Sequence, residues 1–153
     1  MKRLKNKRKQ GGFSLIQVIV ALAVVAILAG IALPSFKEAA RKAKRAEGRS
    51  ALYQLMLQEE RFYSQRNKYI AFTSGSSGEE EKRFRWFSGN SPESSAYEIK
   101  AEACAGETIS DCVRLVATPG TGRVDANFKD PECGEFTLAS TGEKGANKAE
   151  CWR

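Results

Sequence analysis

Residues 11–34 read GGFSLIQVIVALAVVAILAGIALP, and no other stretch of this chain constrains its architecture as strongly. Between Phe13 and Leu33 only Ser14 and Gln17 are distinctly polar. As an α-helix rising about 1.5 Å per residue, 20 such residues reach about 30 Å, the thickness of a bilayer hydrocarbon core. A secretory signal has a shorter apolar run, of about 7 to 15 residues. The sequence therefore predicts a membrane-spanning helix.

The positive charge is concentrated ahead of that helix. The chain has 153 residues and a formal net charge of +7, and residues 1–12 carry six cations and no carboxylate. Residues 51–153 carry 13 basic and 16 acidic side chains. Cations on one flank of a membrane helix keep that flank in the cytoplasm, so the chain after Pro34 is predicted to face outward. The excess positive charge therefore mainly indicates the orientation of the membrane helix, and it does not by itself indicate nucleic-acid binding.

The composition excludes several kinds of chemistry. The chain has no His, which removes Ser-His-Asp and Cys-His catalysis and the commonest zinc ligand. No two of its four cysteines form a Cys-x-x-Cys pair, so a zinc ribbon or a thioredoxin-like motif is unsupported. We predict that the protein is not an enzyme and that it holds no metal and no cofactor.

The residues after the apolar stretch continue a helical pattern. Apolar side chains recur at every third or fourth position through residues 36–65, which predicts an amphipathic helix. Pro34 removes one backbone donor and is predicted to kink the helix near the membrane exit. The basic block at residues 37–50 either contacts lipid headgroups or acidic neighbours, or is a solvated helix face.

The C-terminal part alternates apolar and polar residues, as strands do. After a long connection at 66–96, we predict strands over residues 97–103, 112–118 and 135–140, with a further short strand around 123–128. Turn-forming residues separate them. The predicted fold class is α+β, in which a long N-terminal helix packs on a small antiparallel sheet.

The junction Gly11-Gly12-Phe13, with an apolar helix and Pro34 behind it, resembles that of the type IV pilin family. Precursors in that family have a short basic leader that ends in Gly and a hydrophobic helix that begins with Phe. The resemblance implies that a prepilin peptidase cuts between Gly12 and Phe13 and methylates the new N-terminus of Phe13. Removal of residues 1–12 leaves 19 basic and 18 acidic side chains. The alternatives are a simple N-terminal membrane anchor and an uncleaved signal.

Two further segments favour the pilus branch of this family over secretion pseudopilins. EERFYSQRNKY at residues 59–69 is similar to the end of the long helix in PilE-like minor pilins of the type IVa class, and a terminal Cys-Trp with an upstream Cys-Gly fits the same group. The resemblance implies a pilin fold in five segments: a leader at 1–12, a transmembrane and filament-core helix at 13–35, an amphipathic half at 36–65, an αβ-loop at 66–96, and a sheet with a disulfide-bounded C-terminal loop at 97–153.

One position departs from the family pattern. Most pilins have Glu five residues after the cut, and that position here is Gln17. In the family this carboxylate is thought to neutralise the N-terminal ammonium of a neighbouring subunit, which an amide cannot do because it carries no charge. Either this chain occupies a special place such as the filament tip, or Gln17 suffices and the subunit is incorporated like the others.

The four cysteines permit three disulfide pairings. Cys104 ends the first predicted strand and Cys112 begins the second, so a bond between them would close a hairpin. A bond between Cys133 and Cys151 resembles the disulfide-bounded loop that type IV pilins expose. By chain entropy a loop of that size gains about 3 kcal/mol. Disulfides also agree with an outward-facing head.

Residues 82–87 read KRFRWF and interleave cations with aromatics, as surfaces that bind nucleic acid do. The candidate DNA contacts are Lys82, Arg83, Arg85 and Trp86. Three glutamates directly before this segment offset its positive field. The alternative is a loop strand whose aromatics cover the sheet while its cations stay solvated.

Together these features predict a structural subunit, a minor pilin of a type IV pilus that serves adhesion, twitching motility or DNA uptake. The resemblance implies as partners other pilins bound through their N-terminal helices, the prepilin peptidase and the pilus assembly platform. It also implies a single-pass inner-membrane protein with a periplasmic head, and afterwards an extracellular fimbrium. The alternatives are a DNA receptor displayed on the pilus, with nucleic acid as its partner, and a type II secretion pseudopilin.

Overall fold

The computed structural model describes residues 14–153, and its dominant element is a single long helix. Helix α1, Leu15–Arg66, has 52 residues, which confirms the long N-terminal helix expected from the sequence. It ends after Arg66 because Asn67 adopts the left-handed conformation at φ 55°, with its N–H bonded to the carbonyl of Tyr63 at 2.7 Å. The helix continues past Pro34, where the kink remains a prediction.

The contacts divide the chain into two units, one ending at Ala40 and one beginning at Arg41. We call residues 41–153 the head. Among the described residues, every buried side chain lies in the head, as do both disulfides. The head therefore has a complete core of its own, and we expect it to fold without the first unit.

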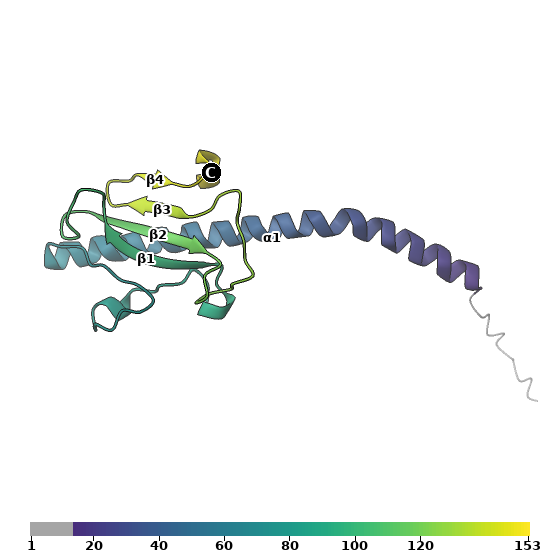
Figure 1. Ribbon diagram of the computed structural model, residues 1–153, viewed down its shortest axis with the longest axis horizontal. Coiled ribbons are helices and arrows are strands. Elements are labelled where there is room, and N and C mark those ends of the chain that lie inside the picture. Colours follow the sequence, from purple (N-terminus) through teal and green to yellow (C-terminus); the bar gives the residue numbers. More distant parts are fainter. Residues whose placement is uncertain (1–13) are drawn as a thin grey trace, which may run out of the picture. The chain divides into compact units, whose positions relative to one another are not determined.

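The head contains a four-stranded antiparallel sheet in the order β1-β2-β3-β4, which Figure 1 shows as four neighbouring arrows. Ile99 lies opposite Ala117, and Leu115 lies opposite Leu138, so the three longer strands turn their apolar residues to one face. This arrangement confirms the α+β prediction. The strands are β1 Tyr97–Ala103, β2 Val113–Pro119, β3 Phe136–Ala139 and β4 Lys144–Gly145.

The prediction of a short strand at residues 123–128 is wrong. These residues form turns, in which Asp125 accepts the N–H of Asn127 through its side chain and the N–H of Phe128 through its carbonyl. Asp side chains that bond nearby backbone groups compete with extended structure. The fourth strand is instead β4, which pairs with β3.

The apolar face of the sheet packs on the head half of α1. Leu52 and Leu55 of the helix share one buried cluster with Tyr97 and Phe136 of the strands. Helix and sheet approach closely at Gly48, where a β-carbon would lie 2.8 Å from Cδ2 of the Tyr97 ring. Glycine weakens an isolated helix by about 1 kcal/mol relative to alanine. At this position its lack of a side chain permits the close approach.

The connection between α1 and β1 is fastened to the sheet and to the core. Phe72 pairs with Ala101, and Phe87 pairs with Glu98, as isolated bridges along the outer edge of β1. Between these bridges Phe84 is buried and stacks on Phe72 with ring centroids 5.2 Å apart. The connection also contains the short 3-10 helices η1 Glu81–Arg83 and η2 Pro92–Ser94, and a third, η3 Ala149–Trp152, lies near the C-terminus.

Candidate functional site

The first candidate site is the apolar half of α1. An 18-residue window of this helix has a mean hydropathy of 2.8 and none of it is buried, so α1 is long and apolar enough to cross a membrane. Leu15, Leu22 and Leu28 are 78%, 64% and 61% exposed. Contact between water and a contiguous apolar surface of this extent is unfavourable, so we expect lipid or another protein to cover it.

The start of α1 is capped by Gln17. The N–H of Ser14 donates to Gln17 Oε1 at 3.0 Å, and the N–H of Gln17 donates to the carbonyl of Ser14 at 2.9 Å. Ser followed three residues later by Gln is a capping-box sequence, in which the later side chain returns to the N–H of the capping residue. Gln17 thus stabilises the helix start. The predicted cleavage and methylation positions, Gly12 and Phe13, lie outside the described residues.

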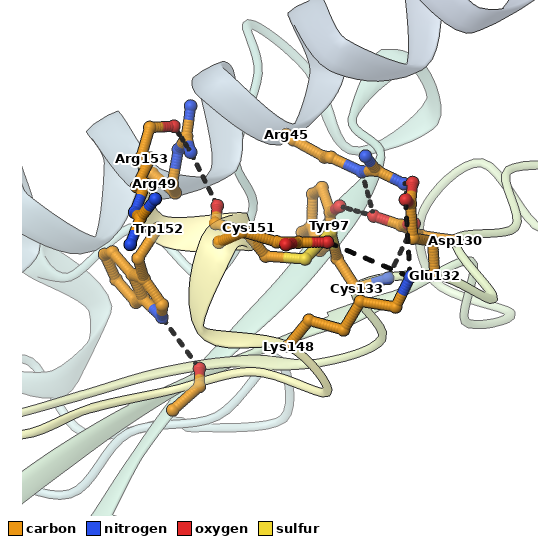
Figure 2. The surroundings of a disulfide bond; sticks show 12 residues. Arg45, Arg49, Tyr97, Asp130, Glu132, Cys133, Lys148, Cys151, Trp152 and Arg153 are labelled. Carbon is orange, nitrogen blue, oxygen red and sulfur yellow. Dashed lines mark hydrogen bonds and ion pairs between the residues drawn. A yellow bond between two sulfur atoms is a disulfide. The ribbon is translucent and has the colours of Figure 1, made fainter.

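The cysteines of the head form two disulfides, Cys104–Cys112 and Cys133–Cys151. The first joins the end of β1 to the start of β2, where the N–H of Cys104 also donates to the carbonyl of Cys112 at 3.2 Å. The second closes a C-terminal loop that contains β3 and β4, and Figure 2 shows its surroundings.

A buried ion pair, which we call the Arg45–Asp130 clamp, fastens the residues directly before this loop to α1 (Figure 2). Arg45 donates to the two carboxylate oxygens of Asp130 at 2.8 and 2.6 Å and to Glu132 Oε2 at 2.7 Å. The hydroxyl of Tyr97 donates to Asp130 Oδ2 at 2.9 Å, and the N–H of Cys133 donates to Oδ1 at 3.2 Å. Each carboxylate oxygen of Asp130 therefore accepts two hydrogen bonds, which offsets the cost of burying its charge.

The clamp keeps its charges at neutral pH. Burial alone would raise the pKa of Asp130, but the hydrogen bonds from Arg45, from the Cys133 N–H and from Tyr97 outweigh burial and hold this pKa below its ordinary value. The hydrogen bond to Asp130 raises the pKa of Arg45. Burial, followed by the hydrogen bond to Asp130, raises the pKa of Tyr97. At neutral pH the clamp is therefore a pair of opposite charges.

The basic block at residues 37–50 does not form one solvated face. Arg45 belongs to the clamp, and Arg49 donates from Nη1 to the carbonyls of Cys151 and Arg153 at 2.6 and 2.5 Å. The interpretation of these two arginines as lipid-facing or solvated side chains is wrong. The sequence could not show this, because their partners lie 85 to 104 residues further along the chain.

The four candidate DNA contacts differ in their surroundings. Lys82 pairs with Glu79 at 3.4 Å, and Trp86 packs partly buried against the core. Arg83 and Arg85 are exposed, and within residues 14–153 neither forms a salt bridge. The segment therefore begins at the end of η1 and continues as a loop, with Phe84 and Trp86 packed toward the core and Arg83 and Arg85 exposed.

Sequence reasoning missed a buried carboxyl group on α1. Glu59 is completely buried, and its Oε2 accepts the N–H of Ile70 at 3.2 Å, whereas its Oε1 has no hydrogen-bond partner among the described residues. Burial raises the pKa of Glu59 to about 7. The adjacent Glu60 is exposed and accepts the hydroxyl of Tyr69 at 2.9 Å. No sequence signal distinguishes these two glutamates.

Two family models match this chain, one over its N-terminal part and one over most of the remainder. A family model described as the prokaryotic N-terminal methylation motif matches residues 7–33. A second model, described as "Type IV minor pilin ComP, DNA uptake sequence receptor", matches residues 34–137, more than half of the chain. The chain is therefore a type IV pilin. More particularly, it belongs to the minor pilin family of the second model.

The chain is similar to individual pilins over part of its length. The chain is 32% identical over 69 residues to the type IV major pilin protein PilA of Myxococcus xanthus strain DK1622, a match that covers 45% of this chain and 31% of that protein. A type IV pilin structure from Shewanella oneidensis aligns over 74% of this chain and 98% of its own, with 23% identity and a TM-score of 0.47. The non-core minor pilin PilV of Neisseria meningitidis aligns over 71% and 91%, with 19% identity and a TM-score of 0.44.

Proposed function

We propose that this chain is a minor subunit of a type IV pilus that is made as a membrane-anchored precursor and enters the filament through the apolar half of α1. The observation that carries the proposal is that a membrane-length apolar helix, which no described residue of the chain buries, continues into a disulfide-linked head. Such a helix is stable in lipid and, after extraction, among similar helices of neighbouring pilins.

The proposed precursor is cut between Gly12 and Phe13 by a prepilin peptidase, which also methylates Phe13. This cleavage removes the six cations that keep the N-terminus in the cytoplasm. Before assembly the head lies in the periplasm, where its disulfides persist. The proposed segments are the leader at 1–12, the filament-core helix at 13–35, the amphipathic half at 36–65, the loop at 66–96 and the sheet with its C-terminal loop at 97–153. The head has no catalytic role in this proposal.

Gln17 suits a subunit at the end of the filament. Its amide closes the cap with Ser14, which a glutamate would do equally well, but it supplies no charge to the Phe13 amine of a neighbouring pilin. A terminal subunit has no such amine above it to neutralise. Gln17 therefore preserves the helix start without adding an unpaired charge to an apolar core.

Immunogold labelling of sheared pili tests both assembly and position. We expect label on the wild-type chain at filament ends, and label along the shaft for the variant Gln17→Glu. The neutral variant Gln17→Ala is the matched control and should stay at the ends. Wild-type label along the shaft would contradict the terminal position, and the absence of label from all pili would contradict the pilus subunit itself.

DNA binding by the head is a second candidate function. What favours it is the match of residues 34–137 to a family whose description names a DNA uptake sequence receptor. The head should then shift labelled duplex DNA at low salt, and the double variant Arg83→Ala with Arg85→Ala should lower the salt dependence by about one counterion per lost phosphate contact. The variant Arg123→Ala, also at an exposed arginine, is the control. A wild-type head that shifts no DNA would remove this candidate.

A further inference from the structure

Two adjoining cavities follow the side of α1 that faces residues 83–85. They measure about 270 and 180 Å³ and share Gln58 in their walls. We call them together the arginine–glutamine groove. Its polar residues are Gln54, Gln58, Arg61, Gln65, Arg83 and Arg85. The groove belongs neither to the apolar half of α1 nor to the Arg45–Asp130 clamp.

Both walls of the groove are held in place. The α1 wall consists of residues 54, 58, 61 and 65, whose spacing of three and four residues puts them on one helix face. In the opposite wall the burial of Phe84 leaves its neighbours Arg83 and Arg85 outside. The Nε2 of Gln58 donates to the carbonyl of Arg83 at 3.0 Å and ties the walls together.

The groove is positively charged and has an apolar floor. Of the described residues that line it, three are arginines and none is a carboxylate or a lysine. In the described part of the chain, Arg61, Arg83 and Arg85 form no salt bridge. Leu55 and Phe84, both buried, form part of the floor. The groove therefore offers guanidinium and amide donors above a surface that can take an apolar side chain.

We infer that the arginine–glutamine groove binds a short acidic segment of another pilus protein. Arginine forms bidentate pairs with carboxylates and is enriched at protein interfaces, from which lysine is depleted. Glutamine amides can pair with the backbone of an extended peptide. From residue 51 to residue 65 the helix rises about 21 Å, which accommodates about six extended residues. The inference rests on the proposed assembly into a pilus and adds a partner surface to it.

The same features fit a nucleic acid less well. Base stacking requires an open aromatic face, whereas of the two aromatic rings that line the groove Phe84 is only 4% exposed and Phe62 is partly buried. Glu79 is largely exposed, and three glutamates, residues 79–81, directly precede the segment that forms one wall of the groove. These carboxylates would repel a polyanion that extends beyond the groove, whereas a short acidic peptide can lie within it.

Photo-crosslinking of the full chain in piliated cells tests the inference. We would replace Gln54 by the photoreactive p-benzoyl-phenylalanine, irradiate the cells, and identify the linked peptide by mass spectrometry. The expected product is a nuclease-resistant adduct whose partner peptide has at least two carboxylates within about six residues. Adding Arg61→Glu and Arg85→Glu should lower the adduct yield at least about tenfold, whereas Arg123→Glu should leave it unchanged.

Four results would each overturn the inference: no adduct, an adduct that nuclease removes, a partner peptide without carboxylates, or an unchanged yield in the charge-reversed variant. The amount of chain in the sheared pilus fraction is measured in the same cells. Normal incorporation with one of these four results refutes the groove alone, whereas a wild-type chain absent from pili refutes the proposed function.

Discussion

Replacing Glu59 by Gln is expected to change how the stability of the head depends on pH. The pKa of Glu59 is about 7 in the folded head, above its ordinary value of 4.5, chiefly because of burial and further because of the nearby charge of Glu60. The unfolded chain therefore loses this proton first as the pH rises. The free energy of unfolding falls between about pH 4.5 and pH 7 as a result.

The size of the effect follows from the two pKa values. At about 1.4 kcal/mol per pH unit, the interval from 4.5 to about 7 corresponds to about 3 kcal/mol. Gln cannot ionise, but it can still accept the N–H of Ile70 that Glu59 accepts. Glu59→Gln should therefore match the wild type near pH 4 and exceed its free energy of unfolding by about 3 kcal/mol at pH 8.

Urea unfolding of the oxidised head, followed by the fluorescence of Trp86 and Trp152, measures this difference at each pH. Glu143→Gln, which removes an exposed carboxylate, is the matched control and should shift stability by less than about 0.5 kcal/mol at every pH. Parallel pH profiles for Glu59→Gln and the wild type would refute the assignment of a raised pKa to this buried carboxyl.

Three further changes test the packing of the head. Arg45→Met leaves a buried carboxylate without its counter-ion and should cost about 3–5 kcal/mol in urea unfolding, whereas the half-exposed Lys44→Met should cost less than about 1 kcal/mol. Gly48→Ala gains about 1 kcal/mol of helix propensity but pushes the buried Tyr97 ring aside. We therefore expect a lower Tm for this variant, and a higher Tm would contradict the close contact between Gly48 and Tyr97. Removing the C-terminal disulfide by the double Cys→Ser substitution should cost about 3 kcal/mol, and equal stability of the variant and the oxidised head would count against the loop as a stabilising element.

The elements that the sequence predicts well are those that depend on local patterns. The apolar run and the spacing of three and four residues define α1, and period-two alternation defines β1, β2 and β3. The strand expected near Asp125 is absent because a side-chain hydrogen bond favours a turn there, and strand propensity does not include that bond. The short β4 has too few residues for any pattern.

The contacts that join distant segments could not be predicted. Arg45 and Asp130 lie 85 residues apart, and in the sequence Arg45 is one of six cations in a basic block. Glu59 is buried and Glu60 exposed because of how α1 is rotated against the sheet, which only the packed core determines. The arginine–glutamine groove likewise needs the connection to fold back along α1 before Arg83 can face Arg61.

The mass of the chain recovered from sheared pili tests the pilus assignment most directly. We expect this material to lack residues 1–12, to begin at Phe13 with one added methyl group, and to retain both disulfides. A full-length, unmethylated chain that stays in the membrane fraction of piliated cells would contradict it.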